Sequence, residues 1–112
     1  MKLPSPIPMD LAELIAARLR VIGDANRLRI LDLLGDGELS VGQITERLEM
    51  SQQNTSKHLT LLLQAGIVSR RREGTSSYYA IADPGVYDLC EQVCGGLQAQ
   101  LAELTALVEG SR

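Results

Sequence analysis

Residues 51–81 constrain the fold more than any other part of this 112-residue chain. They begin with a helical pattern in which Leu59, Leu62 and Leu63 share one side. The other side carries polar residues at the spacing i, i+3, i+4 and i+7, namely Gln53, Ser56, Lys57 and Thr60. Their amide, hydroxyl and ammonium groups are the partners that base edges and phosphates require, although a merely solvated helix face has the same composition.

A basic hairpin pattern follows this helix directly. Three consecutive arginines, Arg70, Arg71 and Arg72, precede a turn-forming stretch at 73–76, and residues 77–81 read as a returning strand. We expect the three arginines to contact phosphate and the polar tip to enter a minor groove. A polar-faced helix followed by such a hairpin predicts a winged helix-turn-helix.

Charge and composition agree with this interpretation. The net charge is −3, yet residues 51–82 hold four basic side chains against one acidic side chain. An acidic remainder lowers nonspecific binding to nucleic acid and suits a repressor that must release its site. Because Phe and Trp are absent, the core is expected to consist of Leu, Ile, Val and Ala from packed helices. No apolar run approaches the roughly 20 residues that span a membrane, and we expect a cytoplasmic protein.

Helix-capping residues place the other elements. Asp24 is a suitable N-cap for a helix at 25–34, and Ser40 with Gln43 forms a capping-box pattern for a short helix through residue 48. Residues 49–50 make the turn and Ser51 caps the next, recognition helix. A first helix is expected at 9–21 and a last one from the break at 83–85 to about residue 108.

The sequence therefore predicts a mainly α fold with a small β-hairpin, in the order α-α-α-α-β-β-α. We expect a flexible segment at 1–9, a dimeric DNA-binding domain at 10–108 and a tail at 109–112. The last helix carries an apolar stripe, made of Val86, Leu89 or Cys90, Val93, Leu97, Leu101, Leu104 and Val108. Together with the first helix it either closes the monomer core or, as we prefer, forms a homodimer interface.

With these elements in place, the chain resembles the ArsR/SmtB family of dimeric bacterial repressors. The resemblance rests on GDANRLRILDLL at 23–34, ELSVGQIT at 38–45, SQQNTSKHLTLLLQAGIV at 51–68 and RREGTSSYYAI at 71–81. It implies a non-enzymatic protein that binds a pseudo-palindromic operator overlapping its own promoter and dissociates when an inducer binds. The predicted DNA-binding residues are Ser51, Gln52, Gln53, Asn54, Ser56, Lys57, His58, Thr60, Arg70, Arg72, Thr75 and Ser76.

The chain departs from the family where its metal sensors hold their ligands. Ser40-Val41-Gly42 stands where many carry Cys-x-Cys, and 83–85 reads Asp-Pro-Gly where others carry Asp-x-His, with no later His. The single His, His58, lies inside the recognition helix, where a DNA-facing or packing role is more common than metal ligation. Neither common metal site is present, and no cofactor is required.

Cys90 and Cys94 are the only cysteines and lie one helical turn apart. They are either small packing residues or a thiol pair that senses a thiophilic inducer: arsenic(III) or another soft metal ion, an oxidant, or a persulfide donor. The first hypothesis is therefore a repressor with a thiol-sensed inducer. The second is a repressor of the same family without one, and the third is a winged-helix module that binds a protein. The three arginines argue against the third.

Overall fold

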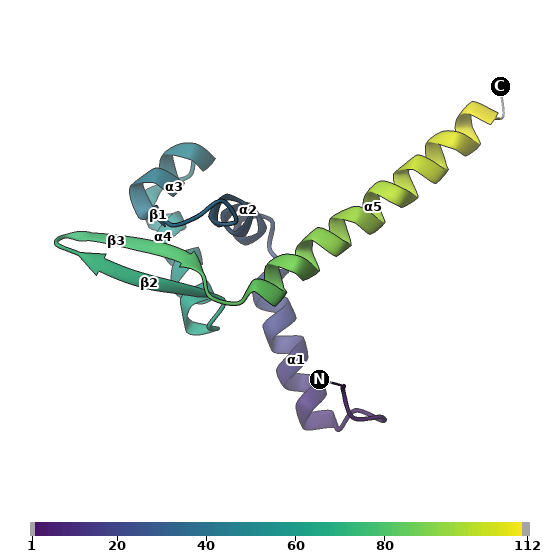
Figure 1. The fold of residues 1–112 in the computed structure, drawn as a ribbon, viewed down its shortest axis with the longest axis horizontal. Helices are drawn as coiled ribbons and strands as arrows, with labels where there is room; N and C mark the ends of the chain where they lie inside the picture. Colours follow the sequence, from purple (N-terminus) through teal and green to yellow (C-terminus); the bar gives the residue numbers. More distant parts are fainter. Residues whose placement is uncertain (1, 111–112) are drawn as a thin grey trace. The chain divides into compact units, whose positions relative to one another are not determined.

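The structure, a computed structural model, describes residues 2–110. The chain divides after Ala82 into two compact units, the second consisting of the last helix (Figure 1). The elements in chain order are α1 (Met9–Ile22), α2 (Ala25–Leu34), β1 (Leu39–Ser40), α3 (Val41–Leu48), α4 (Gln52–Gln64), β2 (Val68–Glu73), β3 (Ser76–Ile81) and α5 (Pro84–Gly110). The expected mainly helical fold with a small hairpin is confirmed.

Local capping sets the helix boundaries as expected. The Asp24 carboxylate accepts hydrogen bonds from the backbone N–H groups of Asn26 and Arg27, at 2.9 and 3.1 Å, and so caps α2. Ser40 and Gln43 form the capping box at the start of α3. The α1 helix ends one residue later than expected, at Ile22.

A tight turn joins α3 to α4. Glu49 ends α3 in the left-handed conformation, with φ at 54°, and Met50 and Ser51 lead into the next helix. Ser51 then caps α4, its Oγ accepting from the N–H of Asn54 at 3.1 Å. These two helices form the helix-turn-helix, with α4 in the position of the recognition helix.

The sheet has three strands, whereas the sequence predicted a two-stranded hairpin. The additional strand is β1, whose Leu39 and Ser40 pair with Tyr79 and Tyr78 of β3, giving the antiparallel order β1-β3-β2. Two residues are too short to show an alternating pattern, so β1 was missed. Pairing of β2 with β3 runs from Val68–Ile81 to Glu73–Ser76 and fixes which side chains share a face.

The core of the first unit contains aliphatic side chains from several elements. The fully buried ones are Ile30, Leu31, Ile44, Leu59, Leu62, Ile67 and Val68. They come from α2, α3, α4, the residue that precedes β2 and the first residue of β2, so the recognition helix is anchored by one side only. Its opposite side is left to solvent, as the sequence pattern predicted.

The second unit is α5. Asp83 precedes it, and its carboxylate accepts from the N–H of Gly85 at 3.1 Å. The helix extends to Gly110, so residues 109 and 110 of the predicted tail are helical, while 111 and 112 lie outside the described residues. At the other end Met9, which the sequence analysis placed both in the flexible segment and at the start of the first helix, is the first residue of α1, and residue 1 lies outside the described part. None of the described helices is long and apolar enough to cross a bilayer.

Candidate nucleic-acid interface

The exposed face of α4 carries the residue types that read base edges. Gln52, Gln53, Ser56, Lys57 and Thr60 are all exposed. The Thr60 hydroxyl donates to the carbonyl oxygen of Ser56 at 2.8 Å and keeps an acceptor site towards solvent. This face therefore offers amide, hydroxyl and ammonium groups on one helical stripe.

Three other residues of the predicted set, the N-cap Ser51 and the α4 residues Asn54 and His58, differ from those on the exposed stripe. Asn54 is half-buried, and Ser51 uses its hydroxyl to cap the helix. His58 is buried, with 7% of its surface exposed, and its Nδ1 lies 3.1 Å from an Arg27 guanidinium nitrogen. Its prediction as a DNA-facing residue is therefore wrong. The helical period places position 58 between the polar and apolar stripes, and packing against α2 turns it inward.

Strand alternation separates the three arginines of β2. Arg70 is paired with Tyr79 and Arg72 with Ser77, whereas Arg71 is paired with Tyr78 and lies on the other face of the sheet. Arg70 and Arg72 are exposed, and neither makes a side-chain hydrogen bond or ion pair within residues 2–110. They share a face with the buried Val68 and Tyr79, the side of the sheet that packs on the core.

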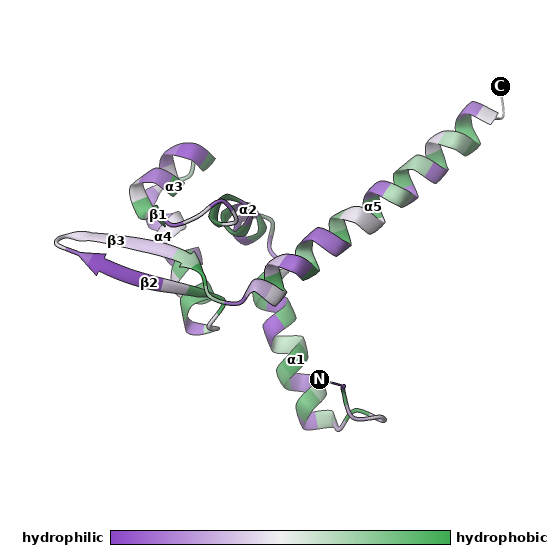
Figure 2. Cartoon of the chain, in the orientation of Figure 1, coloured by the Kyte–Doolittle hydropathy of each residue, from purple (hydrophilic) through white to green (hydrophobic). Residues whose placement is uncertain are grey.

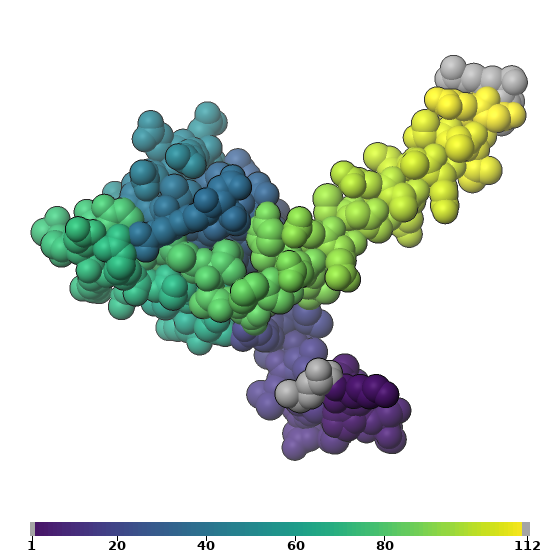
Figure 3. Space-filling view, in the orientation of Figure 1, coloured from purple at the N-terminus to yellow at the C-terminus, as the bar shows by residue number. Residues whose placement is uncertain are grey.

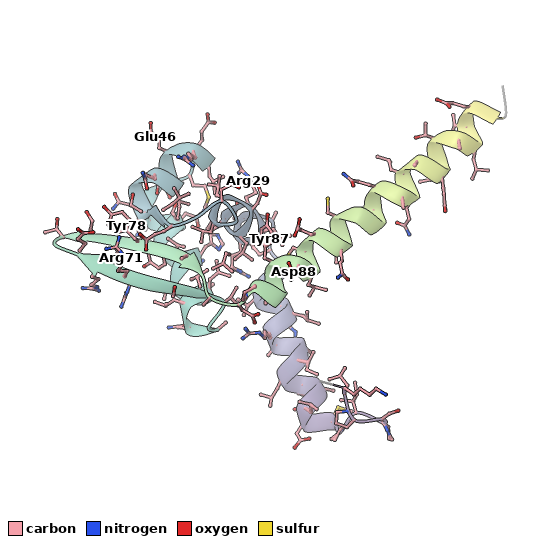
Figure 4. The ribbon with its side chains drawn as sticks, in the orientation of Figure 1. Arg29, Glu46, Arg71, Tyr78, Tyr87 and Asp88 are labelled. Carbon is pink, nitrogen blue, oxygen red and sulfur yellow. The ribbon has the colours of Figure 1, made fainter. Side chains whose placement is uncertain are left out.

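The Arg71 guanidinium is hydrogen-bonded to two carboxylates of the protein. Its Nε and one terminal nitrogen donate to the two Glu38 oxygens at 3.1 and 2.7 Å, and the other terminal nitrogen donates to Glu73 at 2.7 Å. The guanidinium carbon also lies 4.7 Å from the ring centroid of Tyr78, on the neighbouring strand (Figure 4). Arg71 therefore differs from its two neighbours, because its guanidinium is paired within the sheet, and contact of these arginines with phosphate stays a prediction.

These contacts shift the pKa values of Glu38 and Arg71 so that the charged form of each side chain is favoured. Hydrogen bonds from Arg71 hold the pKa of the Glu38 carboxyl below its usual range, and Glu38 and then Glu73 raise the pKa of Arg71. Strand alternation could have separated Arg71 from its neighbours at the sequence level. Its partner Glu38 could not have been found, because it lies 33 positions away on the far side of β3.

The hairpin tip is polar and exposed. Gly74 has φ at 61°, the left-handed conformation that a tight turn needs, and Thr75 and Ser76 beside it are exposed. β2 is hydrophilic along most of its length (Figure 2), and the tip stands at the margin of the first unit (Figure 3). The geometry offers a small polar tip with two arginines, Arg70 and Arg72, behind it.

The two cysteines lie on α5, in the second unit. Cys90 is half-buried and Cys94 is exposed, and both are free thiols. Burial raises the pKa of the Cys90 thiol, which lowers its thiolate fraction at neutral pH. In the described part of the chain, no three His, Cys, Asp or Glu side chains are grouped closely enough to hold a metal ion.

Comparison with known proteins identifies the family. The sequence model described as "Bacterial regulatory protein, arsR family" matches residues 24–70, from the cap of α2 into the β2–β3 hairpin at 68–81, which is the wing. Transcriptional activator HlyU of Vibrio cholerae is 36% identical over 90 residues, covering 75% of this chain and 83% of HlyU. The chain belongs to the ArsR family of winged helix-turn-helix repressors. It is accordingly a transcriptional regulator and not an enzyme.

Solved structures of two mycobacterial proteins are similar to this fold. Rv0081 of M. tuberculosis superposes with a TM-score of 0.77 at 30% identity, covering 86% of this chain and 97% of that one. The homodimeric winged helix-turn-helix DNA-binding domain of Mb0332 from Mycobacterium bovis gives a TM-score of 0.75 at 34% identity, covering 84% and 87%.

Proposed function

We propose that this ArsR-family protein represses transcription by binding a pseudo-palindromic DNA operator as a homodimer. The observation that carries the proposal is the exposed polar face of α4 together with Arg70 and Arg72, whose side chains make no hydrogen bond or ion pair within residues 2–110. Gln52, Gln53, Ser56 and Lys57 are assigned to base edges. The wing arginines, with Thr75 and Ser76, are assigned to the backbone and the minor groove.

The exposed apolar residues of α1 and α5 support the homodimer. Leu97, Leu101 and Leu104 of α5 are 62, 66 and 59% exposed, and Leu14 of α1 is 70% exposed. Hydrophobic and polar residues alternate along α5 (Figure 2), as expected for a helix with one apolar side. A twofold dimer would place two recognition helices about 34 Å apart, the spacing of successive major grooves on one side of DNA. The homodimeric Mb0332 domain supports the same arrangement.

We further propose that Cys90 and Cys94 sense a thiophilic inducer. At 100° per residue, both positions lie on the side of α5 that carries Leu97 and Leu101, so a ligand of the two sulfurs would act at the dimer surface. Two thiolates suit a monomethylated arsenical, while four sulfurs from two subunits would suit a tetrahedral zinc or cadmium ion. A relative named as a probable mercury resistance operon repressor, from Streptomyces lividans, is 34% identical over 83 residues and supports a soft-metal inducer.

The alternative is a repressor of the same family whose cysteines only pack. The raised pKa of Cys90 favours this alternative, because a thiol that stays protonated reacts slowly with metals and oxidants. A winged helix that binds a protein partner is the third candidate. A protein-binding function would give no role to the glutamines and serines on the exposed face of α4 or to Arg70 and Arg72. A DNA-binding repressor works where the chromosome is, so we place the protein in the cytoplasm.

The test uses fluorescence anisotropy with a labelled duplex from the protein's own promoter region. A salt-sensitive complex is expected, and its absence would remove the DNA-binding proposal. The complex is then titrated with methylarsenite, cadmium, zinc and a persulfide donor, for the wild type and for Cys90→Ser combined with Cys94→Ser. If only the wild-type protein dissociates from the duplex, the thiol-sensor proposal is supported. If both proteins respond equally, Cys90 and Cys94 have only a packing role.

A further inference from the structure

Arg27 of α2 joins the end of α1 to the recognition helix. Its Nε donates to the carbonyl oxygen of Val21, and one terminal nitrogen donates to that of Arg20 at 3.5 Å. The other terminal nitrogen lies 3.1 Å from Nδ1 of His58 in the middle of α4, and 4.0 Å from the capping carboxylate of Asp24. The side chains of Arg27 and His58 are only 13% and 9% exposed, so this is a largely buried polar contact.

Chemistry fixes the direction of the contact between Arg27 and His58. A guanidinium can only donate, so Nδ1 of His58 accepts, and the ring proton sits on Nε2. Leaving the guanidinium without this acceptor would strand a buried donor, which gives the arrangement a strong preferred geometry. A second hydrogen bond joins α1 to the C-terminal end of α4, where Arg18 donates to the carbonyl oxygen of Ala65.

We propose that Arg27 and His58 are positioning residues that set the rotation of α4 about its axis and thereby the alignment of its base-reading side chains. The inference rests on the proposed operator binding through α4. His58 lies one position from Lys57 and two from Ser56, so a small rotation at His58 displaces the polar stripe directly. Arg27 is also hydrogen-bonded to the last turn of α1. A displacement of that turn would therefore move His58, and with it the polar stripe of α4, through the Arg27 side chain.

Four variants separate positioning from simple structural support. His58→Leu removes the acceptor, His58→Gln keeps an acceptor of similar reach, and Arg27→Lys keeps the charge but loses the guanidinium fork. Arg29→Ala is the matched control, since it removes an exposed arginine from the same helix. Each protein is measured for affinity to the operator and to a scrambled duplex at several salt concentrations, and for its thermal midpoint. All affinities are taken well below that midpoint.

His58→Leu and Arg27→Lys should lose operator affinity roughly tenfold, the size of one misaligned base contact, while keeping their scrambled-duplex affinity and salt slope. His58→Gln should stay within about threefold of the wild type, and Arg29→Ala should not lose specificity. A lower thermal midpoint with unchanged specificity in His58→Leu and Arg27→Lys would overturn the inference. If the wild type fails to distinguish the operator from the scrambled duplex, the proposed function fails instead, which is a separate result.

Discussion

The guanidinium of Arg71 donates hydrogen bonds to both carboxylate oxygens of Glu38, at 3.1 and 2.7 Å, although the two residues lie 33 positions apart. The contact crosses the middle strand of the sheet at Tyr78, and joins one edge strand to the segment that leads into the other. A bidentate pair of this kind restricts both partners more than a single ion pair would. The pair holds β2 of the wing to the segment before β1. The side chains of Arg70 and Arg72 take no part in it.

The wing arginines should therefore differ in their effect on DNA binding. Arg72→Ala should weaken binding similarly on operator and scrambled duplex and reduce the salt slope by about 1, as expected for one lost phosphate contact. Arg71→Ala should leave the salt slope within about 0.3 of the wild type, because its charge is already paired with carboxylates. Anisotropy titrations over a salt series measure both. Equal slope changes in the two variants would show that Arg71 also contacts phosphate.

Gln53→Ala should act on specificity rather than on general affinity. Gln53 is exposed near the N-terminal end of α4, where recognition helices meet base edges. Losing one bidentate amide contact should cost about 1–3 kcal/mol on the operator and almost nothing on a scrambled duplex. Gln64→Ala, at the other end of the same helix, is the matched control. A uniform loss on both duplexes would place Gln53 against the backbone instead.

The cap of α2 should make stability fall in acid. The backbone N–H of Arg27 is the largest cause that lowers the pKa of Asp24 below its ordinary value of 3.8. The stabilisation is therefore complete above pH 3.8 and disappears as the pH falls through the lowered value. Asp24→Ala should lose about 1 kcal/mol at pH 7, and the difference from wild type should shrink below pH 4.

Urea denaturation from pH 7 to pH 3 measures this loss. Asp32→Ala removes an exposed carboxylate from the same helix and is the control. An Asp24→Ala difference that is the same at pH 7 and pH 3 would mean that the charged form of Asp24 does not stabilise α2.

A charge placed on the apolar stripe of α5 should separate the subunits. Leu101→Asp puts a carboxylate among side chains that the proposed dimer buries, whereas Ala99→Asp puts one on the opposite side of the helix. Light scattering should give twice the 12.2 kDa chain mass for wild type and Ala99→Asp, and the single mass for Leu101→Asp. If Leu101→Asp remains dimeric, the interface lies elsewhere.

Much of the fold is predictable because its determinants are local. The caps at Asp24, Ser40 and Ser51 act within three or four residues, and each begins a helix where the sequence predicts one. The exposed stripe of α4 follows from helical periodicity and is found in the same way.

The sequence failed where contacts between distant segments decide the outcome. β1 has only two residues, and its strand character comes from pairing with Tyr78 and Tyr79. His58 turns inward because Arg27 lies opposite, and the Arg71 guanidinium is paired because Glu38 is within reach. Each of these partners is more than 30 positions away, beyond the range of any local pattern.

DNA binding through α4 and the wing is tested by measuring the affinity of the wild-type protein for the operator and for a scrambled duplex across a series of salt concentrations. Log affinity should fall linearly with log salt for both duplexes, and the operator affinity should be about a thousandfold higher at physiological salt. Equal affinities for the two duplexes, or no salt-dependent binding to either, would contradict the assignment of α4 and the wing to DNA.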